Sequence, residues 1–219
     1  MSELLEIGDR IVALARPGEQ VEVVVGRATS TEVRAYDGQV EQFASATSAG
    51  VGVRVIAGNR QGFAYAGTLD ADVMAETLAE ARDNATFATD DEWLGLAEPD
   101  GLAVPALDLY RESLTRVSTD AKIDLALELE RAVRAADPRI TGVESADYAD
   151  GVSEGAVVST TGIRTYGRET SCYVAAHCVA TDGDDTQTGF GFSVGRTLDD
   201  LDVSVAAGDA ARRATRLLG

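Results

Sequence analysis

The residues able to support covalent or metal chemistry are few and lie close together in the sequence. His177 is the only histidine, and Cys172 and Cys178 are the only cysteines. A catalytic triad would have to include His177, and so would a zinc site that uses histidine. Successive side chains of a strand point to opposite faces, so we expect His177 to face away from Cys178. The two cysteines share a face about 20 Å apart at the rise of a strand, too far for a disulfide.

These spacings favour a structural role for the histidine. A catalytic zinc site usually has three protein ligands, and no three ligands share one face of this strand. We therefore interpret His177 as a core or sheet-surface residue, and we predict no catalytic residue and no metal ligand in the chain. A cysteine hydrolase using Cys178 and His177 is a disfavoured alternative. Ser48, Ser159 and Ser171 lie in no nucleophile elbow.

The charge balance excludes one class of partner. Acidic residues number 37 against 19 basic ones, and the net charge of −18 repels nucleic-acid phosphates. We therefore expect no direct binding of nucleic acid. The carboxylates are scattered along the chain, which favours surface solvation in a salt-rich cytoplasm, and a basic partner is the functional alternative.

The chain also has the features of a cytoplasmic protein. Two cysteines that cannot pair in one strand are typical of a reduced, intracellular protein. The N-terminal segment lacks the basic start of a signal peptide, and no apolar run approaches the length of a membrane span. We expect a cytoplasmic protein that contacts no membrane.

The clearest local pattern is a glycine-rich hairpin that runs into a helix. Gly58-Asn59 tolerates the left-handed backbone of a tight turn, and a second strand returns through 62–66. A helix over 70–86 follows, capped by Thr68 or Asp70. The first strand of the hairpin is indicated by alternating apolar residues at Val51, Val53 and Val55.

A similar unit lies near the C-terminus. Residues 191–199 repeat the Gly, Phe, Thr, Leu and Asp of residues 62–70 at an offset of 129. We infer an internal duplication of a helix–strands–helix unit; independent choice of these residues at two β-to-α junctions is the alternative. The sequence thus predicts an α+β fold, with antiparallel sheet and packed helices. We divide it into a first half at 1–88, a connecting segment at 89–117 and a second half at 118–219.

The remaining elements follow from periodicity and turn residues. Further helices are predicted at 2–16, after a cap at Ser118 or Thr119 until Pro138, and at 199–217. Further strands are predicted at 21–25, 31–36, 39–47, 139–149, 152–160, 163–170, 171–181 and 186–195. Two-residue turns are predicted at Asp37-Gly38, Asp150-Gly151, Thr161-Gly162 and Asp182-Gly183. The alanine-rich last helix should lie tightly on a sheet.

Glycines within these strands are candidates for contact with another chain. A strand without side chains lets a second backbone approach closely, as strand addition by an extended peptide requires. The alternative is that these glycines only permit bulges and twist within one sheet. We predict peptide or partner contact at Gly50, Gly52, Arg54, Gly62, Phe63, Tyr65, Gly189 and Gly191.

Several segments resemble the TldD/PmbA family, whose members are also called modulators of DNA gyrase. The resemblance to the N-terminal half of these proteins lies in GVGVRV at 50–55, GFAY at 62–65, ARDNA at 81–85 and DDE at 90–92. A closer likeness to the PmbA (TldE) branch lies in GR at 167–168, TSCY at 170–173, QTG at 187–189 and the alanine-rich final helix. The resemblance covers nearly the whole chain.

The resemblance implies a metallopeptidase assembly that processes peptides or proteins. A TldD-type subunit supplies the zinc ligands and a PmbA-type subunit completes the assembly. The His-Glu…His motif of the family lies in the C-terminal half, and this chain ends at Gly219 before that half begins, as an isolated domain or a shortened homologue. We therefore expect a non-catalytic N-terminal domain.

The expected partners follow from the same resemblance. They are a TldD-type subunit or a second copy of the chain, in a heterodimer or homodimer, and unfolded peptides. We expect no cofactor in this chain, with zinc only in a TldD-type partner or in a missing C-terminal half. An independent binding or scaffold module without a proteolytic role is the alternative.

Overall fold

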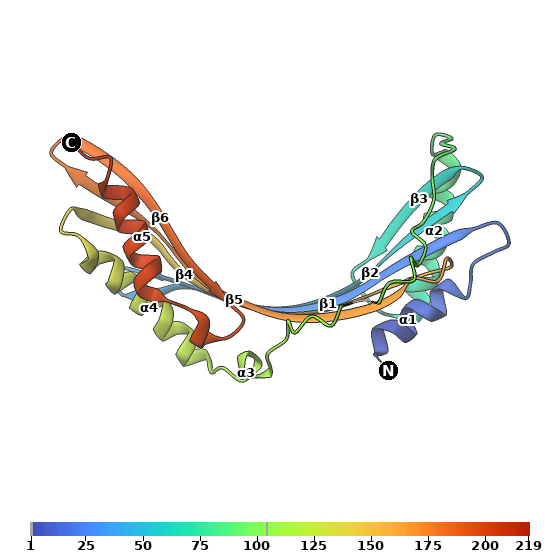
Figure 1. Ribbon diagram of the computed structural model, residues 1–219, viewed down its shortest axis with the longest axis horizontal. Coiled ribbons are helices and arrows are strands. Elements are labelled where there is room, and N and C mark those ends of the chain that lie inside the picture. Colours follow the sequence, from blue (N-terminus) through green and yellow to red (C-terminus); the bar gives the residue numbers. More distant parts are fainter. Residues whose placement is uncertain (1, 104) are drawn as a thin grey trace. The chain divides into compact units, whose positions relative to one another are not determined.

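The computed structural model describes residues 2–103 and 105–219, which form a six-stranded antiparallel sheet with helices packed on it (Figure 1). The strand order is β3-β2-β1-β4-β5-β6. The strands are β1 (Gln20–Tyr36), β2 (Gln39–Ala57), β3 (Arg60–Ala66), β4 (Ile140–Ser159), β5 (Arg164–Asp182) and β6 (Asp185–Gly195). The helices are α1 (Glu3–Val12), α2 (Ala71–Phe87), α3 (Glu112–Thr115), α4 (Thr119–Ala136), the 3₁₀ helix η1 (Leu198–Asp200) and α5 (Val203–Thr215). The predicted α+β class is confirmed. Met1 and Val104, within the predicted segments 1–88 and 89–117, lie outside the described residues.

Four strands are longer than predicted because pairs of predicted strands are continuous. The pairs are 21–25 with 31–36 in β1, 39–47 with the strand through Val51 in β2, 139–149 with 152–160 in β4, and 163–170 with 171–181 in β5. The predicted turn at Asp150-Gly151 is therefore wrong. Asp150 lies inside β4, where its carboxylate accepts a hydrogen bond from the Tyr148 hydroxyl at 2.7 Å and pairs with Lys122 at 2.6 Å. Tyr148 on the same strand and Lys122 on α4 thus hold Asp150 within an extended strand in place of a turn.

The other tight turns and the helix starts match the sequence. Left-handed φ values occur at Asp37, Gly38, Gly58, Asn59, Gly162 and Gly183. Asp70 caps α2 and Ser118 caps α4, each through a side-chain oxygen that accepts a backbone N–H. The last predicted helix is shorter, since η1 precedes α5 and Asp202 caps α5.

Two compact units each take segments from both halves of the sequence. Unit 1 comprises Met1–Ala28, Thr47–Asp108 and Ser153–Arg168; unit 2 comprises Thr29–Ala46, Leu109–Val152 and Glu169–Gly219. The strands β1, β2, β4 and β5 each contribute one segment to each unit. The predicted domains at 1–88, 89–117 and 118–219 are each continuous in sequence, unlike these two units. That division stays a prediction. The duplication relating 38–86 to 162–217 also stays a prediction.

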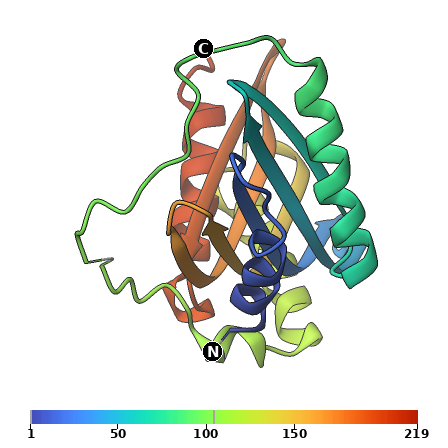
Figure 2. The same cartoon turned by 90° about the vertical axis from the view of Figure 1, so that its right-hand side faces the viewer.

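In unit 1, α2 lies along the β2–β3 hairpin (Figures 1 and 2). The approach is closest at Gly62, where a Cβ would lie 1.9 Å from the Ala81 carbonyl oxygen and 2.3 Å from the Ala85 backbone nitrogen. Only glycine fits there. The buried core residues of this unit include Leu4, Ile7, Ile11, Val21, Val23, Val25, Val53, Val55, Met74, Leu78 and Val158.

In unit 2, α4 and α5 cover one face of the sheet. A Cβ on Gly189 would lie 2.0 Å from the Ala210 carbonyl oxygen, and one on Gly191 would lie 2.0 Å from the Ala206 carbonyl oxygen. Small residues on both elements allow this distance, which confirms the predicted tight packing of the last helix. The buried core residues include Val33, Ala35, Ala126, Leu129, Val133, Val143, Tyr148, Val174, Ala206 and Ala210.

The connecting segment is fixed to the sheet at a few positions. Leu96 is buried, and its N–H donates to the Gln20 side chain at 3.0 Å. The Leu109 carbonyl accepts from the Thr170 N–H and from Arg196 Nη1, both at 3.0 Å. Trp93 and Leu107, by contrast, are 87% and 68% exposed and do not anchor the segment. The connecting segment is therefore held to the sheet mainly by hydrogen bonds of its backbone.

We expect the thermal midpoint of this chain to rise with potassium chloride concentration. A net charge of −18 opposes compaction through repulsion among surface carboxylates, and salt screens that repulsion within about 8 Å at 0.15 M. Thermal melts followed by circular dichroism at rising concentrations are the measurement. A flat or falling midpoint up to molar salt would contradict the high-salt interpretation.

Candidate functional site

The helices leave one face of the sheet open in unit 1, and several predicted contact residues lie on it. In β3, Phe63 and Tyr65 are 54% and 78% exposed, whereas their neighbours Gly62 and Ala64 are buried under α2. The Phe63 and Tyr65 ring centroids lie 6.5 Å apart. This strand therefore presents two aromatic side chains to solvent in the way its alternation predicts.

The adjacent strands complete a shallow apolar surface on unit 1. Phe63 lies over Gly52, since a Cβ there would be 3.2 Å from the ring. Arg54 forms an ion pair with Glu22 of β1, in which the Arg54 Nε donates at 3.1 Å. We call this surface the unit 1 face; it is lined by Glu22, Val24, Gly52, Arg54, Gln61 and Phe63, with Tyr65 beside Phe63.

The predicted contact residues thus separate into two groups. Gly62, Gly189 and Gly191 face the chain's own helices, and their missing side chains admit α2 and α5. A backbone does approach these three glycines closely, as predicted for strand glycines, but it belongs to helices of the same chain. Contact by a peptide or partner stays a prediction at all eight residues.

Unit 2 has its own open face, which the sequence did not identify. Strands β5 and β6 pair so that His177 lies opposite Phe190, Ala175 opposite Phe192 and Tyr173 opposite Val194. We call this surface the aromatic groove; its volume is about 410 Å³ and it is lined by Asp147, Tyr173, Ala175, His177, Phe190, Phe192 and Val194. The only signal in the sequence was the alternation of Phe190, Phe192 and Val194 with glycine and serine.

The rings of the aromatic groove form a contiguous row. The centroid of His177 lies 4.5 Å from that of Phe190, and the centroid of Phe190 lies 5.5 Å from that of Phe192. Tyr173, Phe192 and Val194 are 42%, 48% and 62% exposed. Large apolar side chains that gather on one open face mark interaction sites more often than singly exposed ones.

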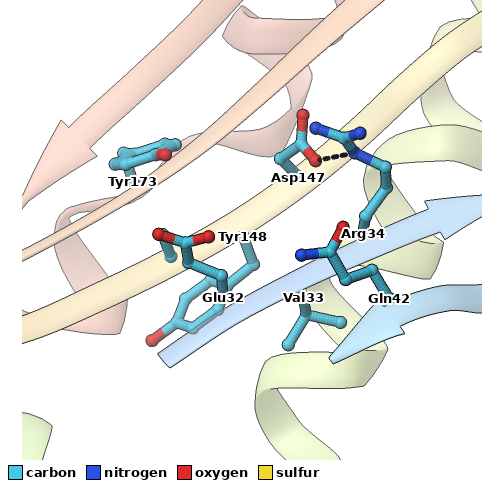
Figure 3. A pocket seen from close by; sticks show the side chains of 8 residues that line it. Glu32, Val33, Arg34, Gln42, Asp147, Tyr148 and Tyr173 are labelled. Carbon is cyan, nitrogen blue, oxygen red and sulfur yellow. Dashed lines mark hydrogen bonds and ion pairs between the residues drawn. The ribbon is translucent and has the colours of Figure 1, made fainter. Parts of the chain in front are cut away.

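Charged side chains lie at one end of this groove. Figure 3 shows Glu32, Arg34, Asp147 and Tyr173 on one side of the strands, with Tyr148 on the other. The Asp147 carboxylate accepts from Arg34 Nε at 2.7 Å and from the Ser145 hydroxyl at 2.8 Å. Burial, and then the nearby Glu32 and Asp147 carboxylates, raise the pKa of Tyr173. The nearby Arg34 guanidinium acts in the opposite direction, so two carboxylates and one cation surround this phenol.

The residues present do not fit a metal site. Among residues 2–103 and 105–219, no three His, Cys, Asp or Glu side chains cluster in a way that could hold an ion. Cys172 and Cys178 are free thiols buried on the helix-covered face, whereas His177 lies on the open face, which confirms the predicted opposition. Burial raises the pKa of both thiols, that of Cys172 to about 11, so neither is a ready thiolate.

We expect the purified chain to hold no stoichiometric zinc. The single histidine and the two buried thiols lie on opposite faces of one strand, so they cannot share an ion. Elemental analysis after extended dialysis is the measurement, with His177→Ala as the matched variant. One zinc per chain that disappears in that variant would overturn this expectation.

Two domains of one known protein family match this chain. Residues 21–85 match PmbA/TldA metallopeptidase domain 1, and residues 112–218 match the PmbA/TldA metallopeptidase central domain. The chain belongs to the PmbA/TldD family. The resemblance predicted from the sequence is therefore confirmed, and the matched stretches cover most of both sequence halves.

Two curated relatives of this PmbA/TldD chain are themselves PmbA proteins. Metalloprotease PmbA of Escherichia coli O157:H7 is 29% identical over 202 residues, which are 88% of this chain and 43% of that protein. The metalloprotease PmbA homolog of Haemophilus influenzae is 26% identical over 152 residues, which are 69% of this chain and 32% of the homolog. The chain spans less than half the length of these relatives.

Solved structures of similar proteins share the fold. A protein of Thermotoga maritima described as a modulator of DNA gyrase superposes with a TM-score of 0.78 at 22% identity, over 98% of this chain and 48% of that one. A similarly described protein of Bacteroides thetaiotaomicron gives 0.80 at 20%, over 99% and 49%. TldE of Thermococcus kodakarensis gives 0.77 at 19%, over 95% and 46%. None of the helices in the described part of the chain is long and apolar enough to cross a membrane.

Proposed function

We propose that this chain is the non-catalytic N-terminal part of a PmbA/TldD-type metallopeptidase assembly, in which it contributes subunit contact or peptide binding. One observation carries the proposal: the chain matches domain 1 and the central domain of the family, while its described residues offer no metal-ligand cluster. Zinc would then belong to a TldD-type partner or to a C-terminal half.

The unit 1 face is the surface we assign to subunit contact, with a TldD-type subunit or a second copy as the partner. Its aromatic rings are exposed, and its two charged side chains, Arg54 and Glu22, pair with each other. Interfaces are typically centred on aromatic residues and arginine, with few unpaired charges. A neutral aromatic surface therefore suits a protein partner better than it suits a small charged ligand.

Co-expression with the TldD-type protein of the same genome tests the proposal. We expect the two proteins to co-purify, and hydrolysis of an unfolded peptide to require the TldD-type subunit. A Phe63→Ala, Tyr65→Ala double variant should lower the co-purified fraction about tenfold, because interface aromatics carry much of the binding free energy. Phe192→Ala, on the open face of unit 2, is the matched control and should leave association unchanged.

The alternative function, an independent binding or scaffold module, makes the opposite prediction. Absence of association, even when a C-terminal half from a full-length relative is fused to the chain, would favour that alternative. It would also remove the assignment of the unit 1 face. Retention of the partner by the Phe63→Ala, Tyr65→Ala variant would reject the assigned face alone.

A further inference from the structure

We propose that the aromatic groove of unit 2 binds extended peptide segments that carry apolar side chains and then a basic side chain at every second position, all on one face of the peptide. This inference deepens the proposed function by naming a class of peptide and the surface that would take it. It requires no proteolytic step and no second subunit, so it can be tested on this chain alone.

The apolar half of the specificity comes from the row of rings. Phe190 stacks between His177 and Phe192, with centroid distances of 4.5 and 5.5 Å, and Val194 continues the row along β6. All of these side chains come from one face of two paired strands, so they form one continuous row. An extended segment placed along it would direct every second side chain toward the rings.

The basic half of the specificity comes from the carboxylates beside Tyr173. Arg34 pairs with Asp147, whose carboxylate accepts its hydrogen bond. Glu32 lines the same end, lies close enough to raise the pKa of Tyr173, and has no ion pair among the described residues. The local balance is therefore negative. A guanidinium can approach Glu32 and also stack on the Tyr173 ring.

The overall charge disfavours the other occupants of such a surface. A second copy of the chain would bring another net charge of −18 to the same place, and a nucleic acid would bring phosphates. An acidic peptide would meet Glu32 directly. A basic segment is the occupant whose charge complements the groove, and electrostatic attraction would also raise its rate of association.

Fluorescence anisotropy with labelled synthetic peptides is the experiment. Three peptides of roughly twelve residues, with glycine at the intervening positions, are compared on the full chain: one has leucines and then arginines at every second position, one replaces each arginine with glutamate, and one replaces each leucine with serine. We expect saturable binding of the arginine–leucine peptide, with both replacements weakening it about tenfold or more. Its affinity should also fall as salt rises, because the attraction is screened.

Single variants locate the site. Phe192→Ala removes a ring from the groove and should weaken the arginine–leucine peptide about tenfold. Phe87→Ala is the matched control: it removes an exposed phenylalanine from the last position of α2, outside both named surfaces, and should leave the affinity unchanged. Glu32→Gln should weaken the arginine–leucine peptide while leaving the weak binding of the glutamate–leucine peptide unchanged or stronger. Circular dichroism of each variant checks that the fold is kept.

Four results would overturn the proposal. They are no saturable binding of the arginine–leucine peptide up to about 1 mM, equal binding of the glutamate–leucine peptide, equal binding of the arginine–serine peptide, and equal losses for Phe192→Ala and Phe87→Ala. Failure to co-purify with a TldD-type subunit bears on the proposed function alone, since no second protein is present in this experiment.

Discussion

Gly191→Ala is expected to lower the free energy of unfolding by about 3 kcal/mol. The added methyl group would lie 2.0 Å from the Ala206 carbonyl oxygen and 2.6 Å from the Ala210 backbone nitrogen. Both atoms belong to the backbone of α5, so relief requires the helix to move away from β6. The lower chain entropy of alanine in the unfolded state returns at most about 1 kcal/mol, so the steric term dominates.

Gly167→Ala is the control for this substitution. Gly167 lies in β5, has no left-handed φ, and would place a Cβ with no atom within 4 Å. We expect its unfolding free energy to be unchanged or raised by about 0.5 kcal/mol. Urea denaturation at equilibrium measures both variants. Equal stability of the two variants would show that α5 does not lie against Gly191 in solution.

Lys122→Met is expected to cost a similar amount, about 3 kcal/mol. Lys122 is the only lysine of the chain, and its Nζ lies 2.6 Å from Asp150 Oδ2 and 3.1 Å from Thr31 Oγ1. The side chains of Lys122 and Asp150 are only 13% and 9% exposed. Removal of the amine leaves a carboxylate in the interior, with the Tyr148 hydroxyl as a remaining donor.

The matched control removes a cation from a surface pair. Arg116 pairs with Glu112, and these side chains are 73% and 64% exposed, so Arg116→Met should change stability by less than about 1 kcal/mol. Adding Asp150→Asn to Lys122→Met should recover part of the loss, because the amide carries no charge. If Lys122→Met costs no more than Arg116→Met, the buried pair contributes nothing beyond a surface pair.

The turns were predictable because a left-handed backbone restricts the choice of residue. Asp37-Gly38 and Gly58-Asn59 favour this conformation through their local backbone preferences, independently of the rest of the chain. The continuity of the long strands was not predictable. Residues 26–30 of β1 bury no side chain, so apolar alternation stops there. The strand continues through that stretch all the same, since backbone hydrogen bonding does not depend on side-chain type.

The exposed aromatic side chains were predictable where one strand carries the pattern. Phe63 and Tyr65 alternate with small residues, and both lie on the open face. The aromatic groove was not predictable in this way, because it depends on the pairing of His177 with Phe190. That register between two strands is not specified by the sequence of either segment alone. The role of Gly62, Gly189 and Gly191 was missed for a similar reason. A glycine indicates close approach but does not identify the approaching backbone.

The division of each long strand between both units has a consequence for how the chain folds. The Thr160 N–H donates to the Val21 carbonyl, and the Val21 N–H donates to the Thr160 hydroxyl, across 139 positions of sequence. Closing so long a loop costs entropy before its contacts stabilise anything, and such topologies nucleate slowly. Unit 1 needs residues up to Arg168. In a nascent chain the β1–β2 and β2–β3 pairs can therefore form early, whereas the edge of β1 that pairs with β4 stays open until the residues of β4 have left the ribosome.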